Sequence, residues 1–82
     1  MAISQERFEQ VAEAVIEEYS YRIDGYSIDG YDITLHVKYN HRDTTYNAYL
    51  GFDSNGKFIT LSNPFDATAP GAIGYEIERR LQ

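Results

Sequence analysis

The chain contains no cysteine, no tryptophan and only two prolines. Without cysteine it can form no disulfide, and it offers neither a thiolate nucleophile nor a cysteine ligand for zinc or an iron–sulfur cluster. No apolar run approaches the ~18 residues needed to span a bilayer. The first ten residues also lack the basic start and apolar stretch of a secretory signal. We therefore expect a cytoplasmic protein without a membrane partner, held together by packing alone.

Basic residues are also scarce. Thirteen Asp and Glu residues face seven Lys and Arg residues, which gives a net charge of −6. The imbalance lies in residues 1–35, with eight acidic and two basic residues, whereas residues 36–82 hold five of each. Such a field repels a phosphate backbone and attracts a basic surface. We expect no direct nucleic-acid binding, and a protein partner with a basic surface.

The 82 residues, 43% of them hydrophobic, suffice for one compact domain over residues 1–82. A first helix is predicted from about Gln5 to Tyr19. Ser4 is a good N-cap, and Ile3 can pack across the cap onto Phe8. One stripe then repeats with the 3.6-residue period of a helix and consists of Phe8, Val11, Ala12, Val15, Ile16 and Tyr19.

A short repeat, IDGYSIDGYD at residues 23–32, follows. Both Asp-Gly pairs could be hairpin turns. We favour a turn at Asp29-Gly30 and a bulge at Gly25, because this register keeps apolar residues on one face of the sheet. It pairs Ile28 with Tyr31, Tyr26 with Ile33, Ile23 with Leu35 and Tyr21 with Val37.

Clean alternation in residues 31–40 predicts the second strand, with odd-numbered residues facing inward. A turn over residues 40–43 and a type I′ turn at Asn55-Gly56 lead into the third and fourth strands. The pairs expected are Tyr39 with Thr44, Val37 with Tyr46, Leu35 with Ala48, Ile33 with Leu50, Tyr31 with Phe52, Phe52 with Ile59, and Leu50 with Leu61.

A last helix is predicted to begin at Thr68 or Ala69, with Pro70 in its first turn and Ile73, Ile77 and Leu81 on one face. The fold class is therefore α+β in the order α-β-β-β-β-α. It is a four-stranded antiparallel meander with both helices packed on one face.

The sequence contains no recognisable catalytic or metal-binding constellation. His36 projects from the polar face of the second strand, where we interpret it as an ordinary exposed histidine, and His41 lies in a turn. Residues 53–56 resemble the start of a calcium loop but lack its later carboxylates. Of the three aspartates in residues 24–32, two belong to Asp-Gly pairs that shape the backbone. We expect no enzyme activity, no metal and no cofactor.

Two features have no role in the expected fold, and they are the candidate partner-binding residues. The first helix carries acidic residues three and four apart with hardly a basic partner, a spacing that weakens a helix. Two aromatic residues are expected to point outward on the polar face of the sheet. The candidate residues are Glu6, Glu9, Glu13, Glu17, Tyr49 and Phe58.

The passage LGFDSNGKFIT at residues 50–60 resembles the closing hairpin of PepSY-type domains. That resemblance implies a hairpin that follows a helix in a domain able to act as a protease-inhibitory pro-segment. Small size and acidity also resemble phage-encoded inhibitors of the anti-CRISPR or anti-restriction type. Neither resemblance assigns a role to a residue of this chain.

Three function hypotheses follow. The first is a non-enzymatic inhibitor or adaptor that binds a macromolecular partner through the acidic helix face and the outward aromatics. The second is a mimic of nucleic acid that blocks the groove of a defence nuclease, which salt would weaken. The third is a small ligand-binding or enzymatic domain that uses the polar sheet face around His36.

Overall fold

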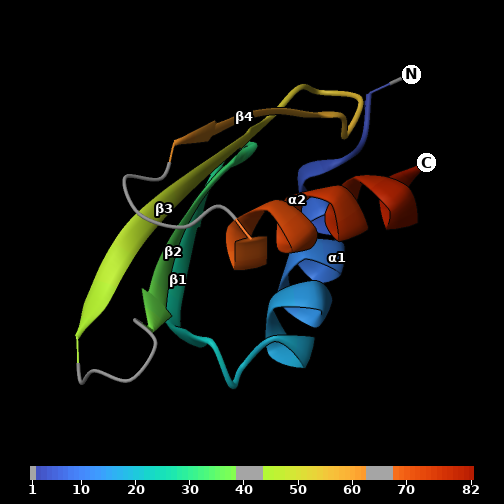
Figure 1. Cartoon of the computed structure of the whole chain (residues 1–82). Helices are drawn as coiled ribbons and strands as arrows, with labels where there is room; N and C mark the ends of the chain where they lie inside the picture. Colours follow the sequence, from blue (N-terminus) through green and yellow to red (C-terminus); the bar gives the residue numbers. More distant parts are fainter. Residues whose placement is uncertain (1, 39–43, 63–67) are drawn as a thin grey trace.

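The computed structural model describes residues 2–38, 44–62 and 68–82. It contains two helices and one four-stranded sheet with the strand order β1-β2-β3-β4, as Figure 1 shows. The predicted α+β meander is therefore confirmed. The elements in chain order are α1 (Gln5–Glu18), β1 (Ile23–Asp29), β2 (Asp32–Lys38), β3 (Thr45–Phe52), β4 (Phe58–Ser62) and α2 (Thr68–Leu81).

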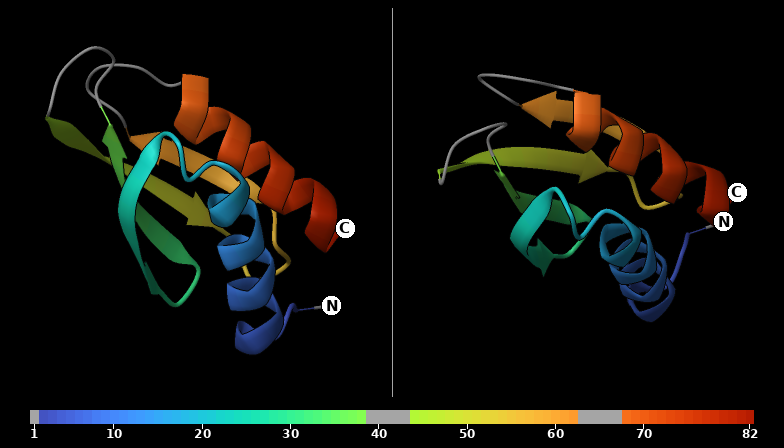
Figure 2. Two further views of the ribbon diagram at one scale, coloured as in Figure 1. Left: turned by 90° about the horizontal axis from the view of Figure 1, so that it is seen from below. Right: turned by 60° about the horizontal axis from the view of Figure 1, so that its bottom comes forward.

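Both helices pack on the same side of the sheet, and no other described element covers the opposite side (Figures 1 and 2). The core lies between the sheet and the helices. Each of these elements buries apolar side chains there, because a sheet face and a helix stripe must both be removed from water. The largest fully buried side chains are Phe8, Val15, Ile33, Leu35, Val37, Leu50, Pro70, Ile73 and Ile77.

Helix α1 begins as the sequence predicts. The Ser4 side chain accepts a hydrogen bond from the backbone N–H of Arg7 at 3.2 Å, which satisfies one of the free donors of the first turn. Phe8 is fully buried, and its ring meets those of Tyr31 and Phe52 edge to face, each at a centroid distance of 5.2 Å. The helix is thereby fixed onto the sheet.

The central pair of strands has the predicted register. Val37 pairs with Tyr46, Leu35 with Ala48 and Ile33 with Leu50. All six residues are buried, because alternation places every second side chain of each strand on the covered side. The predicted pair of Tyr39 with Thr44, the turn over residues 40–43 and His41 lie outside the described residues.

The register predicted for β1 is wrong by two residues. Gly30 and Tyr31 form the loop, with Gly30 at a φ of +62°, and Asp29 pairs with Asp32. The bulge exists beside Gly25, with Asp24 as the extra residue. The pairs observed are Ile28 with Ile33, Tyr26 with Leu35 and Ile23 with Val37.

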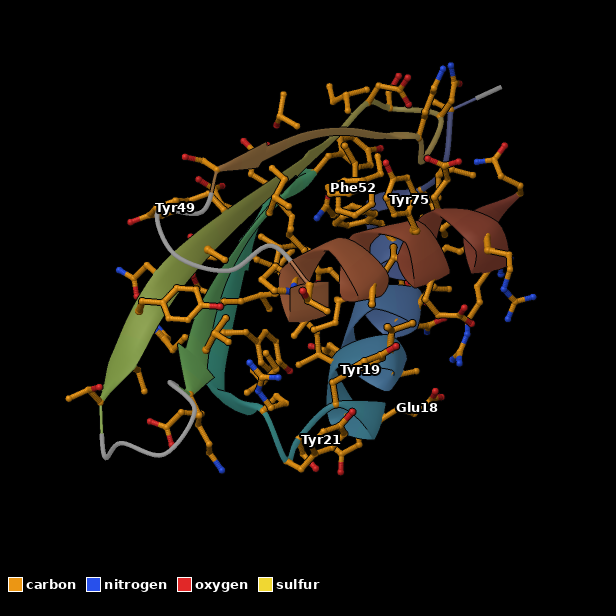
Figure 3. All side chains as sticks on the ribbon, in the orientation of Figure 1. Glu18, Tyr19, Tyr21, Tyr49, Phe52 and Tyr75 are labelled. Atoms are coloured by element: carbon orange, nitrogen blue, oxygen red, sulfur yellow. The ribbon has the colours of Figure 1, made fainter. Side chains whose placement is uncertain are left out.

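Tyr21 does not pair with Val37 as expected. It belongs to the link between α1 and β1, where its side chain is 69% exposed. Its ring stacks on that of Tyr19 at a centroid distance of 6.2 Å, and both are labelled in Figure 3. The α1–β1 link therefore includes Tyr21, which was predicted to lie in the first strand.

The loop between β3 and β4 is one residue longer than the expected Asn55-Gly56 turn. The backbone N–H of Asp53 donates to the Lys57 carbonyl at 2.9 Å, and Gly56 takes a φ of +84°. The Asp53 carboxylate accepts from the N–H groups of Asn55 and Lys57 at 2.9 and 3.0 Å. The carboxylate thus orders the loop, as short polar side chains often do.

This longer loop moves Phe52 opposite Phe58, so the predicted pair of Phe52 with Ile59 is wrong. A bulge at Ile59 absorbs the extra residue, and Leu50 pairs with Leu61 as predicted. Ile59 is 55% exposed as a result.

Helix α2 has the predicted apolar face. Ile73, Ile77 and Leu81 are buried, and Pro70 lies in the first turn. Gly74 allows a close approach, because a Cβ atom there would lie 2.5 Å from the Phe58 ring. The second helix therefore packs tightly on β4.

Candidate functional site

The acidic residues of α1 lie along its flank next to the first hairpin. Glu6, Glu13 and Glu17 are exposed, and Glu9 is half-buried. The Gln5 side-chain amide donates to Glu9 Oε2 at 3.0 Å and to the Gly30 carbonyl at 2.6 Å. This amide ties the start of the acidic row to the β1–β2 loop.

Tyr26 of β1 lies beside this acidic row. Partial burial of the phenol and the neighbouring Glu13 and Glu17 carboxylates raise the pKa of Tyr26. The Tyr26 side chain stays 41% exposed, because β1 is an edge strand and α1 covers it only in part. We call the surface formed by Glu6, Glu9, Glu13, Glu17 and Tyr26 the acidic flank.

The acidic flank lacks cationic partners in the described ranges 2–38, 44–62 and 68–82, where no ion pair engages any of its four glutamates. The opposite flank of α1 differs. There Glu18 meets Arg80 of α2 at 2.7 Å, and Arg80 also meets Glu76 at 2.7 Å.

Hydrogen bonds from Arg79 and Arg80 lower the pKa of Glu76 to about 2, and the bond from Arg80 lowers the pKa of Glu18. The carboxylates between the two helices are therefore used for structure. Those of the acidic flank remain available to another molecule.

The open side of the sheet carries Tyr49, as predicted, with its side chain 48% exposed. A chain of polar contacts leads to it. The Asn47 amide donates to the Tyr49 hydroxyl at 3.4 Å, and its Oδ1 lies 2.7 Å from His36 Nδ1. The His36 ring also lies close over Gly25, where a Cβ would be 3.3 Å from its Cδ2. His36 therefore belongs to a network that positions Tyr49.

Phe58 does not lie on the open side, which corrects the expected orientation. Because of the longer loop, it turns toward the helices, where it is half-buried. Its ring lies 5.3 Å from that of Phe52 and 5.1 Å from that of Tyr75. Tyr49 lies on the open side of the sheet (Figure 3), whereas the four glutamates belong to α1, which packs on the covered side. The six candidate residues therefore do not form one continuous surface.

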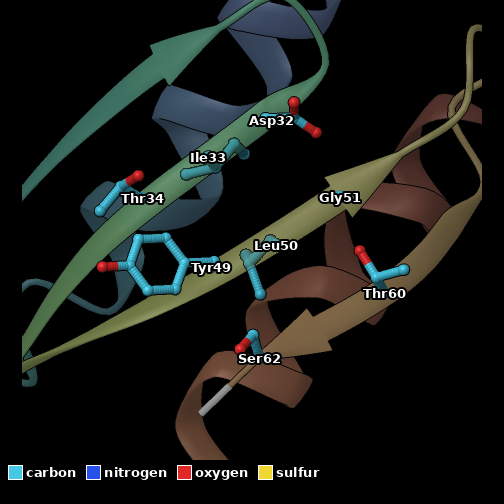
Figure 4. Close-up of a pocket in the computed structure, with 8 residues that line it drawn as sticks. All are labelled: Asp32, Ile33, Thr34, Tyr49, Leu50, Gly51, Thr60 and Ser62. Carbon is cyan, nitrogen blue, oxygen red and sulfur yellow. The ribbon is translucent and has the colours of Figure 1, made fainter.

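A hollow of about 240 Å³ lies on the open side, next to Tyr49 (Figure 4). Gly51 forms its floor, because a Cβ at this position would collide with Thr60 Oγ1 and lie 3.5 Å from Asp32 Oδ1. We call this depression the Gly51 hollow. The side chains around it that carry polar groups are Asp32, Thr34, Tyr49, Thr60 and Ser62.

A second hollow, of about 150 Å³, lies between β4 and α2. It is lined by Phe58, Ile59, Thr60, Leu61 and Tyr75, of which Ile59 and Tyr75 are more than half exposed. The sequence did not indicate either hollow, since each depends on which residues face each other across strands. For the Gly51 hollow, a lone glycine inside the third strand was the one feature of the sequence that could have pointed to it.

The described part of the chain contains no group of three or more His, Cys, Asp or Glu side chains able to hold a metal ion. No described helix is long and apolar enough to cross a membrane.

Comparison with known proteins gave no match, since no family model fits the chain and no characterised protein or solved structure is significantly similar to it. The resemblance of residues 50–60 to a PepSY hairpin therefore gains no support from these comparisons.

Proposed function

We propose that this chain is a small non-enzymatic interaction domain that binds a protein with a basic surface through the acidic flank. The observation that carries the proposal is the contrast between the two flanks of α1. Carboxylates next to α2 are paired with arginines, whereas those of the acidic flank have no cationic partner in the parts of the chain that the structure describes.

The row of glutamates on the acidic flank destabilises α1, and the fold itself does not require it. Like charges three and four residues apart destabilise a helix by about 0.2–0.5 kcal/mol per pair. A partner with lysine and arginine residues would remove this repulsion, and the field of a protein with a net charge of −6 would steer it toward the flank. Tyr26 adds an exposed aromatic surface at the same place.

A polybasic peptide tests the proposal directly. Fluorescence anisotropy should show that labelled hexalysine binds the protein, with an affinity that falls steeply between about 0.05 and 0.2 M salt. The double variant Glu13→Gln/Glu17→Gln should weaken binding by about fivefold or more, because each exposed ion pair contributes up to about 1 kcal/mol.

The matched control is Asp24→Asn/Glu78→Gln, which removes the same charge from residues outside α1. The glutamine at position 78 can still accept from the Phe58 N–H, as Glu78 Oε1 does at 2.8 Å. Equal losses in the two double variants would mean that peptides sense only the net charge, and the proposal would then fail.

The nature of the partner separates the narrower hypotheses. An inhibitor of the nucleic-acid-mimic type would compete with DNA or RNA for a basic protein, and added salt would weaken that competition. An adaptor would bind its partner without displacing nucleic acid. An enzyme or ligand carrier built around His36 is the remaining alternative, and it predicts that His36→Ala abolishes turnover or ligand binding.

A further inference from the structure

We propose that the Gly51 hollow is a subsite for the guanidinium group of an arginine from the basic partner. This inference rests on the proposed function, because it names a second point at which the same partner is held. It concerns the open side of the sheet, on which neither of the two described helices packs (Figure 4).

The polar groups around the hollow suit a donor-rich cation. Among the residues that the structure describes, its lining contains one carboxylate and several hydroxyl groups, all of which can accept hydrogen bonds, and no lysine, arginine or histidine. A guanidinium carries five N–H donors and no acceptor. Within the ranges that the structure describes, no hydrogen bond or ion pair engages the Asp32 carboxylate. This charge is therefore available to an incoming cation.

Tyr49 provides an aromatic wall that is held in place before any ligand arrives. With the proton of His36 on Nδ1, His36 donates to Asn47 Oδ1, and the Asn47 amide donates to the Tyr49 hydroxyl oxygen. The phenolic hydrogen of Tyr49 is then not used in this network. Arginine stacks on aromatic faces more readily than lysine does, because its guanidinium is planar and weakly hydrated. A fixed ring lowers the entropy cost of such a contact.

Charge and position connect the hollow with the acidic flank. Asp29 and Asp32 face each other across the β1–β2 hairpin, an arrangement that is unfavourable for two like charges. The loop between them is the one whose Gly30 carbonyl accepts from Gln5, which also holds Glu9. Carboxylates therefore continue from α1 around this end of the sheet to the hollow. A basic partner lying on the acidic flank can reach the hollow from there.

The test compares hexa-arginine with hexalysine on the intact domain. We expect hexa-arginine to bind more tightly and to shift the backbone amide resonances of Gly51 and Thr60 in two-dimensional NMR spectra. Asp32→Asn should lower its affinity by about fivefold, as loss of one exposed ion pair would. Tyr49→Leu should reduce the preference for arginine over lysine.

Asp24→Asn is the control, since it removes the same charge from an exposed position outside the hollow, and it should change affinity less than twofold. Thermal unfolding of each variant verifies that it folds. Equal effects of Asp32→Asn and Asp24→Asn, or hexa-arginine binding without a shift at Gly51, would overturn the subsite.

The two proposals fail in different ways. If only the α1 substitutions weaken both peptides, the acidic flank stands and the subsite is wrong. If Asp32→Asn weakens hexa-arginine and Glu13→Gln/Glu17→Gln does not, the hollow binds arginine without the flank, and the proposed function is wrong.

Discussion

The two sides of the sheet are built on different principles. On the covered side, the buried apolar side chains of β2 and β3 face each other in pairs. The Glu18–Arg80–Glu76 network closes the margin of this side. The open side has hydroxyl, amide and imidazole groups in contact with one another and with water. Burial stabilises the covered side, whereas order on the open side contributes little to folding. The open side therefore has room for binding.

The largest expected change in the free energy of unfolding comes from a comparison of two neighbouring residues in β2. Leu35 is fully buried on the covered side, and Thr34 faces the open side. Leu35→Ala should lower the free energy of unfolding by about 2–5 kcal/mol, because it removes buried methyl groups and leaves a cavity. Thr34→Ala should change it by less than about 0.5 kcal/mol. Urea unfolding followed by circular dichroism measures both, and similar losses would remove the contrast between the two sides.

The next effect concerns the floor of the hollow. Gly51→Ala should lower the free energy of unfolding by about 1–3 kcal/mol, because the added methyl group collides with Thr60 Oγ1. Adding Thr60→Ala should recover most of that loss, while Thr60→Ala alone costs little. A double-mutant cycle gives the coupling, and additive losses would show that the two residues do not meet.

A smaller effect appears at the margin of the covered side as a dependence on pH. The pKa of Glu76 is lowered from 4.5 to about 2 in the folded protein by its hydrogen bonds with Arg79 and Arg80. A carboxyl group with a lowered pKa stabilises the fold above its unfolded pKa, and this contribution disappears as the pH falls.

Glu76→Gln should therefore unfold at a lower temperature than the parent protein at pH 7. The difference should shrink between about pH 4.5 and pH 2. A difference that stays constant across this range would show that the carboxylate charge is not its cause.

The smallest effect is expected for His36→Ala. This substitution removes the contact with Asn47 on the open side and should change the free energy of unfolding by less than about 0.5 kcal/mol. The side-chain amide protons of Asn47 should nevertheless exchange faster with solvent, because Asn47 Oδ1 loses its contact with His36 Nδ1 at 2.7 Å and the amide is no longer held against the Tyr49 hydroxyl. Thr45→Ala, on the same strand, is the control. Unchanged exchange would mean that His36 does not order this network.

The sequence predicts the central strands and fails at the edge strands for a physical reason. Alternation identifies which face a residue occupies but not its partner, so a shift of two residues leaves every face unchanged. The register of β1 was wrong in this way. In β4 both Phe58 and Ile59 are apolar, and alternation could not show which of them faces inward.

The acidic flank could be predicted in part, because its glutamates are spaced along a single helix. Tyr26 was expected in the core, and only the incomplete cover of an edge strand exposes it. The Gly51 hollow forms only where residues of β2, β3 and β4 meet. It therefore depends on how these strands are paired. Surfaces within one element are therefore easier to predict than those shared between strands.

Each edge strand of the sheet contains a bulge, at Asp24 in β1 and at Ile59 in β4. A bulge breaks the regular row of backbone donors and acceptors and increases the local twist. Regular pairing is thereby limited to residues 25–29 in β1 and 60–62 in β4, so an added strand from another molecule would find only a short row of backbone groups on either edge. The sheet is therefore a poor template for growth into fibres, although an exposed isoleucine lies on one of its edges.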